Sequence, residues 1–339
     1  MQGLQNNHCK QCHIYKLLCN FADEYNIYET AGRDYITVKQ HINGSLLKMT
    51  EQIEKKDVAL VLSSGGARGL AHIGAIEELE AQGFRITSVA GCSMGALIGG
   101  VYASGKLEEF REWMKTIDRK KMLELTDFSL SLNHLVKGTR IIEAIMEFVP
   151  DVLIEDLPIP YCAVATDWKT GREVVFRIGR LFDAIRASIS LPSFYEPVQR
   201  DGMILIDGGV LNPIPMNRVK RHEGDILVGV DVSGHDYAAQ WETQHELTER
   251  RKRDKSLKAQ ILNRLIPDNI EFNYYTVLSR TSSLMIRQNS ILMTRLMKPE
   301  ILVDIQMNRY GSFDFDKSEK LIAIGRQKTL QAIQKFQSE

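Results

Sequence analysis

Short apolar runs alternate with longer segments of helical periodicity along most of the chain after residue 57. A short apolar run between polar or glycine positions predicts a buried strand, and apolar residues three and four apart predict an amphipathic helix. The predicted strands are Val58–Leu62, Ile86–Ala90, Tyr161–Ala165, Glu173–Phe176, Ile204–Ile206, Ile226–Val232 and Ile301–Ile305. The predicted helices are Leu70–Leu79, Ala96–Ser104, Leu107–Ile117, Ile141–Phe148, Leu181–Ile189, residues 277–292 and Ser318–Phe336.

The order of these elements indicates the fold class. Residues 57–104 read as strand, loop, helix, strand, turn and helix, which is typical of a parallel sheet with helices as crossovers. We therefore expect an α/β fold with a mostly parallel, doubly wound sheet.

Composition divides the chain into four regions. Residues 1–56 are polar with weak periodicity, so we expect a weakly structured N-terminal extension. Residues 57–235 form the predicted core, and 236–270 are a charged insertion or linker. Residues 271–339 are predicted to form a helix–strand–helix segment that packs on the core.

Charge and cysteine content narrow the class of protein. The 339 residues carry 43 basic and 43 acidic side chains, so no global attraction to nucleic acid is expected. Five scattered cysteines argue against a disulfide framework. We see neither a secretory signal nor an apolar stretch long enough to span a bilayer, and we expect a cytoplasmic protein.

Two local features outside the predicted core have alternative readings. The Cys-x-x-Cys of Cys9 and Cys12, with Cys19 nearby, lacks the second ligand pair of a zinc site, so we expect no metal. The basic run Arg250–Lys255 suggests peripheral contact with anionic lipid. A solvated loop is the alternative, because Glu246, Glu249 and Asp254 dilute the charge.

The most informative motif is Gly91-Cys92-Ser93-Met94-Gly95, which has the form Gly-x-Ser-x-Gly. It lies between a predicted strand and a predicted helix, as in the strand-to-helix turn that exposes a nucleophilic serine. The helix N-terminus beneath Ser93 favours negative charge. We therefore take Ser93 as the candidate nucleophile.

A glycine-rich loop, Ser63–Gly69, follows the first predicted strand. It is neither Gly-x-Gly-x-x-Gly nor a P-loop, because Ser64 occupies the first glycine position and no Gly-Lys-Ser/Thr follows. Alone, the loop is compatible with nucleotide binding, an oxyanion hole or a plain turn. The serine motif downstream favours the oxyanion hole, since acyl transfer needs fixed N–H donors.

The general base has several candidates. His222, at the end of a predicted polar helix (residues 218–223), His235 and His245 have the chain order of a hydrolase histidine, but none has a local motif. Asp207 ends a predicted strand before Gly208 and Gly209, where loops of a parallel sheet build sites. Paired with Ser93, Asp207 is the better candidate.

Three other polar residues near these motifs have structural readings. We expect His72 to be a packed, hydrogen-bonded histidine, Cys92 to fill space in the core, and Asp167 to stabilise a turn. A catalytic histidine, thiol chemistry and a supporting carboxylate are the respective alternatives.

Taken in this order, the three motifs resemble those of the patatin-like phospholipase family. Val61–Gly69 resembles the glycine-rich oxyanion loop, with Ser64 where the family usually has a third glycine. Residues 91–95 resemble the nucleophile elbow, and Asp207-Gly208-Gly209 resembles the aspartate motif of a Ser-Asp dyad. Residues 187–192 and Pro197-Val198 are also similar to the segment before that motif in bacterial members. The resemblance covers residues 57–235 well and residues 274–328 more weakly.

The resemblance implies a three-layer α/β/α fold and hydrolysis of acyl esters in lipids without histidine, metal or cofactor. By this resemblance Ser93 attacks, Asp207 is the base, and the amides of Gly65, Gly66 and Ala67 hold the oxyanion. Arg68 steadies the loop or the negative charge of the substrate, and Gly69, Gly91, Gly95, Gly208 and Gly209 support the motifs. Ser64 fits this loop only if its φ is negative.

Other function classes stay open at this point. A lipid- or partner-binding module that keeps the fold is one alternative, and a nucleotide-binding protein is another. The implied partners are a lipid or acyl-ester substrate and, through a local patch, a membrane surface.

Overall fold

The structure is a computed structural model that describes residues 56–125, 139–192, 195–234, 274–306, 310–311 and 314–339. The chain divides into two units, Met1–Glu54 and Lys55–Glu339, and all the described residues belong to the second. Residues 8–19, with the Cys-x-x-Cys, and residues 236–270, with the basic run, therefore lie outside the described residues, as do His235 and His245.

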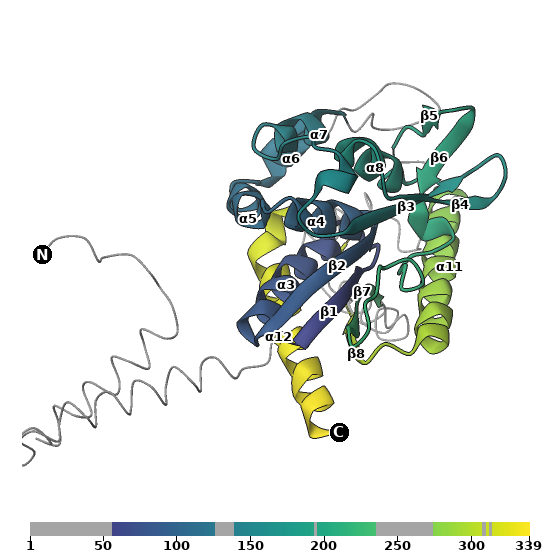
Figure 1. Cartoon of the computed structure of the whole chain (residues 1–339). Helices are drawn as coiled ribbons and strands as arrows, with labels where there is room; N and C mark the ends of the chain where they lie inside the picture. The colour runs from purple at the N-terminus through teal and green to yellow at the C-terminus, as the bar shows by residue number, and fades with distance from the viewer. Residues whose placement is uncertain (1–55, 126–138, 193–194, 235–273, 307–309, 312–313) are drawn as a thin grey trace, which may run out of the picture. The chain divides into compact units, whose positions relative to one another are not determined.

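The described strands form one eight-stranded sheet (Figure 1). The strands are β1 (Lys56–Leu62), β2 (Phe84–Cys92), β3 (Tyr161–Asp167), β4 (Arg172–Phe176), β5 (Val198–Arg200), β6 (Met203–Asp207), β7 (Ile226–Gly234) and β8 (Ile301–Gln306). Their order is β5-β6-β3-β2-β1-β7-β8, and β4 pairs with β3. The run β3-β2-β1-β7-β8 is parallel, whereas β4 and β6 pair antiparallel with β3 and β5 pairs antiparallel with β6.

Helices connect and cover these strands. They are α3 (Ala71–Ala81), α4 (Met94–Ala103), α5 (Leu107–Lys115), α6 (Arg119–Leu125), α7 (Thr139–Met146), α8 (Leu181–Ser188), α11 (Tyr274–Met297) and α12 (Ser318–Ser338). Short 3-10 turns are η1 (Gly66–Leu70), η2 (Ile154–Asp156), η3 (Gly208–Val210) and η4 (Phe315–Lys317).

Strand β1 shows how the sheet separates two cores. Its residues from Val58 to Leu62 are fully buried, as the apolar run predicts for a central parallel strand. Val58, Leu60 and Leu62 pack into a large cluster with α3, α4, α8 and α12. Ala59 and Val61 point to the opposite face, into a smaller cluster that includes Met293 and Met297 of α11. Because both faces are covered, the fold is a three-layer α/β/α fold with a mostly parallel sheet, and the predicted fold class is confirmed.

Most predicted elements differ from the observed ones by one or two residues at an end. The short edge strand β5 was not predicted, and the first helix is preceded by η1 rather than starting at Leu70. The prediction of a polar helix end over residues 218–223 was wrong, because none of these residues is helical; they belong to the irregular connection before β7. Gly83 follows α3 with φ 84°, in the left-handed conformation that commonly ends a helix.

Helices α3 and α12 approach closely at two glycines. A Cβ built on Gly325 of α12 would lie 1.9 Å from the carbonyl oxygen of Ala71, and one on Gly74 of α3 would lie 1.9 Å from that of Ile322. Since the atoms met are backbone atoms, a side chain at either position would push the helices apart. Helix α12 is thereby packed directly on the helix that follows η1.

We expect Gly325→Ala to lower the free energy of unfolding by about 1–3 kcal/mol or more, because overpacking at a backbone contact forces the helices to shift. Urea unfolding followed by circular dichroism measures the change. Lys328→Ala, on the exposed side of α12, is the matched control and should stay within about 0.5 kcal/mol of wild type. Equal stability of the two variants would contradict the close crossing.

Candidate active site

Strand β3 brings the two main site segments together. Cys92, at the end of β2, pairs with Val164, and Asp207, at the end of β6, pairs with the adjacent residue Ala165. The strand that leads to Ser93 and the strand that carries Asp207 therefore end one residue apart along β3. The result is a hydrogen bond of 2.6 Å from Ser93 Oγ to Asp207 Oδ2.

Ser93 has a backbone conformation that is rare for a residue with a side chain. Its φ is 54° and its ψ −120°, and it immediately precedes α4. Such conformations are strained and are kept when the surrounding structure holds them. The Ser93 N–H donates to Ser188 Oγ at 2.9 Å, and Ser188 Oγ donates to the carbonyl oxygen of Val164 at 2.7 Å. Ser188, fully buried in α8, thus ties the strained turn to β3.

The Asp207 carboxylate is buried and held by both of its oxygens. Oδ1 accepts the N–H of Gly209 at 2.7 Å, which leaves Oδ2 for Ser93. Burial raises the pKa of Asp207 to about 6, against the opposing effect of hydrogen bonds from Ser93, Gly209 and Cys92. The carboxylate is therefore ionised at neutral pH, yet basic enough to take up a proton near pH 6.

The glycine-rich loop lies between the end of β1 and η1. Ser64 is not among the residues with positive φ, so its side chain fits without backbone strain. Gly66 has φ 58°, in the region that favours glycine. The first N–H groups of a helical turn have no acceptor within it, so the start of η1 offers donors to a bound anion.

Two side chains hold this loop. Arg68, which is 8% exposed, donates from Nε to the carbonyl oxygen of Gly65 at 3.1 Å. His72 is fully buried and hydrogen-bonds through Nε2 to the carbonyl oxygen of Ser63 at 2.9 Å. Because a carbonyl only accepts, Nε2 is the protonated nitrogen, and burial lowers the pKa of His72 to about 4. His72 is therefore a neutral donor to the loop backbone at neutral pH.

The other residues considered from the sequence have different surroundings. Cys92 is buried, with Sγ 3.9 Å from Asp207 Oδ1, and burial raises the pKa of its thiol. Asp167 accepts hydrogen bonds from the N–H groups of Lys169 and Ile204 and from Thr170, which stabilise the turn after β3. His222 is exposed and contacts Asp225 through its ring, 3.2 Å away. The structure thus brings Ser93 together with Asp207, and places neither His72 nor His222 in that pair.

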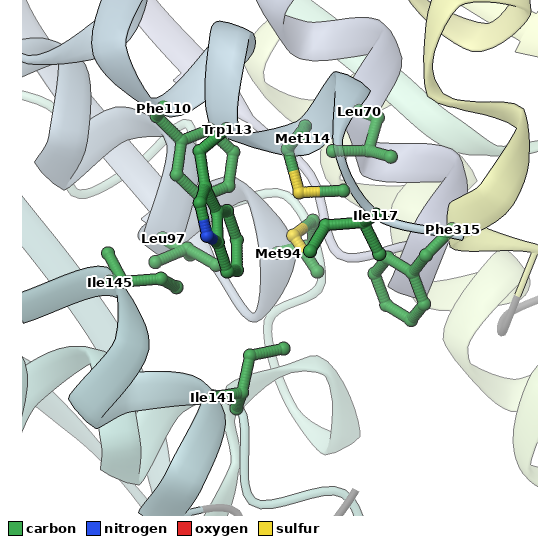
Figure 2. A pocket seen from close by; sticks show the side chains of 10 residues that line it. All are labelled: Leu70, Met94, Leu97, Phe110, Trp113, Met114, Ile117, Ile141, Ile145 and Phe315. Carbon is green, nitrogen blue, oxygen red and sulfur yellow. The ribbon is translucent and has the colours of Figure 1, made fainter. Parts of the chain in front are cut away.

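An apolar cavity of about 20 Å³ lies beside the elbow (Figure 2). All ten of the residues that line it are apolar, and they come from η1, α4, α5, α7, η4 and the residues just after α5. Met94, which follows Ser93, and Leu70, at the end of η1, form part of its wall. The serine turn and the glycine-rich loop therefore both border an apolar space. Two flexible methionines, Met94 and Met114, line this space.

Metal ligation and membrane spanning have no support in the described part of the chain. There, no three histidine, cysteine, aspartate or glutamate side chains are grouped so that they could hold a metal ion. None of the described helices combines the length and apolarity that crossing a bilayer requires.

Comparison with known proteins identifies similar chains. Residues 60–219 match the family model described as patatin-like phospholipase. An uncharacterized NTE family protein of Mycobacterium bovis is 42% identical over 209 residues, which cover 62% of this chain and 55% of that protein. The neuropathy target esterase sws of Drosophila melanogaster is 29% identical over 220 residues, 63% of this chain and 15% of that protein. The chain thus spans about half the length of the mycobacterial relative.

Among solved structures, VipD from Legionella pneumophila aligns at 15% identity with a TM-score of 0.43. The alignment covers 84% of this chain and 67% of VipD.

The packing around Gly65 allows a test of the loop. A Cβ on Gly65 would lie 2.4 Å from Val232 Cγ2, and the next atoms are 3.6 Å away. The clash with Val232 is therefore the main contact that a side chain at Gly65 would meet. We expect Gly65→Ala to displace the loop and slow labelling of Ser93 by a fluorophosphonate probe by about 10²-fold, the usual effect of losing one oxyanion donor.

Adding Val232→Ala to that variant removes Cγ2 and should restore most of the labelling rate. Val232→Ala alone supplies the baseline, and thermal unfolding shows whether each variant is folded. A double variant as slow as Gly65→Ala would mean that the clash is not what positions the loop.

Proposed function

Because the chain belongs to the patatin-like phospholipase family, we propose that it is a lipid acyl hydrolase that works through a Ser93–Asp207 dyad. The observation that carries this proposal is the 2.6 Å hydrogen bond from a strained serine to a buried aspartate. Two further features support the proposal: the neighbouring loop has backbone N–H donors, and an apolar cavity lies beside the elbow. The proposed substrate is an acyl ester of a lipid.

In the proposed reaction, Asp207 Oδ2 accepts the Ser93 hydroxyl proton as Oγ bonds to the ester carbonyl carbon. The carbonyl oxygen becomes an oxyanion, which the N–H groups of Gly65, Gly66 and Ala67 receive at the start of η1. Collapse of this intermediate expels the alcohol part of the lipid, which takes the proton from Asp207. Water then attacks the acyl-enzyme carbonyl and gives a proton to Asp207. As this second intermediate collapses, the fatty acid leaves and Asp207 returns the proton to Ser93 Oγ.

Two features of the site favour this chemistry at neutral pH. A carboxylate is a weak base for a hydroxyl in water, and the burial that raises the pKa of Asp207 to about 6 strengthens it. The N-terminus of α4 lies next to Ser93 and stabilises negative charge on its oxygen. Arg68 acts indirectly, by holding the carbonyl of Gly65.

We expect Ser93→Ala and Asp207→Asn each to fold normally and to lose more than about 10³-fold of turnover on a soluble short-chain nitrophenyl ester, because each removes one half of the dyad. Ser104→Ala, a serine at the other end of α4, and Asp183→Asn, an exposed aspartate in α8, are the matched controls. The fluorophosphonate probe should label wild type at Ser93. Unchanged turnover in either dyad variant would end the model, and a folded wild type that takes no label would favour a lipid-binding module.

The pH dependence follows from the raised pKa of Asp207. A general base must be deprotonated, so kcat/KM should be flat above about pH 6 and fall about tenfold per unit below it. Release of the acid product from a soluble ester, measured by chromatography, gives the profile, and circular dichroism at each pH checks that the protein stays folded. A rate that stays constant down to pH 5 would show that Asp207 does not act as this base.

A further inference from the structure

Helix α11 has an unusual charge for this chain. Its 24 residues contain three arginines and neither aspartate nor glutamate, in a chain whose net charge is zero. Arg287 forms ion pairs with Asp231 of β7 and Asp304 of β8. Arg295 is exposed, as is Lys298 just beyond the helix. Part of the positive charge of α11 therefore faces solvent.

The same helix leaves a row of large apolar side chains exposed. Its inner side packs on the sheet through Met293 and Met297 and through the fully buried Ser290. Its outer side carries the α11 stripe, which we define as Val277, Leu284, Met285, Leu292 and Leu296, exposed by 48%, 45%, 59%, 51% and 73%. At 3.6 residues per turn these five lie within a sector of roughly 120° and extend over about 28 Å.

The helix is joined to the candidate active site. Asn289 Nδ2 donates to the carbonyl oxygen of Val210 at 3.4 Å, in the η3 turn that directly follows Asp207. Leu211, the next residue, is itself 39% exposed. A surface that binds α11 would therefore lie close to the segment that carries the proposed base.

Charge distinguishes between the possible occupants of the stripe. A second copy of the chain would bring the same arginine-bearing, acid-free helix against itself. The segment 235–273, which precedes α11, has seven basic and seven acidic side chains and offers no net negative charge. An anionic lipid surface offers an apolar phase for the stripe and negative headgroups for Arg295 and Lys298, as for amphipathic helices that lie in a membrane interface.

We propose that α11 docks this protein on anionic membrane surfaces through its stripe. The choice of partner rests on the proposed function, since an acyl hydrolase of lipids must reach them in a bilayer. The docking itself is independent of the dyad, so the two can fail separately. The stripe enters the headgroup boundary, and the flanking cations bind phosphate groups there.

The test is co-sedimentation of the full chain with vesicles of phosphatidylcholine alone or mixed with phosphatidylglycerol, at low and high salt. We expect binding to the anionic vesicles that weakens with salt. Leu284→Gln with Met285→Gln should reduce the bound fraction about tenfold or more, and Leu296→Gln alone should reduce it less. Ile178→Gln, at a residue 72% exposed outside α11, is the matched control and should bind like wild type.

Turnover of a soluble ester is measured on the same samples, because it reports the dyad and not the docking. It should be equal in wild type and in all these variants. Wild type that turns over the ester but does not bind anionic vesicles would overturn the proposal. Stripe variants that bind as well as wild type would also overturn it, because another segment would then bind the lipid. Loss of a dimer in the stripe variants, measured by sedimentation velocity, would overturn it too, because the stripe would then bind a second copy of the chain.

Discussion

The hydrogen bond between Ser93 and Asp207 depends on the register of two strands against β3. Because Val164 pairs with the end of β2 and Ala165 with the end of β6, strand pairing brings Ser93 and the Asp207 carboxylate close together. A shift of one residue in either pairing would turn the side chains to the other face of the sheet. The apolar side chains of the two cores oppose such a shift, so core packing fixes the geometry of the site.

Strain and close contacts are concentrated where this geometry is held. Ser93 has a positive φ, and burial removes the Asp207 carboxylate from water. Gly65 packs against Val232 with no room for a side chain. The first two features cost stability, and each has a specific partner: Ser188 for the serine backbone, and the Gly209 N–H for the carboxylate. These partners hold Ser93 and Asp207 in place without a ligand, which is the preorganisation that the proposed oxyanion stabilisation requires.

Much of this arrangement could be predicted from the sequence because its signals are local. Buried parallel strands are largely apolar, so β1, β3 and β7 were recognisable from their apolar runs, and glycine patterns marked the elbow and the loop. Ser188 was not identified, because its partner Ser93 lies 95 residues away and a serine in a helix has no distinctive pattern. Strand β5 has only three residues, too few for a period. The cavity beside Met94 is lined by residues from segments far apart in the sequence, and local sequence patterns do not show that these segments meet.

The contact between α3 and α12 links the element that follows the glycine-rich loop to a segment far downstream in the chain. The backbone of α12 fits against Ala71, directly after η1, and against Gly74, where a Cβ would meet the carbonyl oxygen of Ile322. During synthesis α3 is made long before α12, so the apolar surface behind the loop stays uncovered until that helix emerges. A newly made chain would then acquire its ordered loop only after α12 has been synthesised.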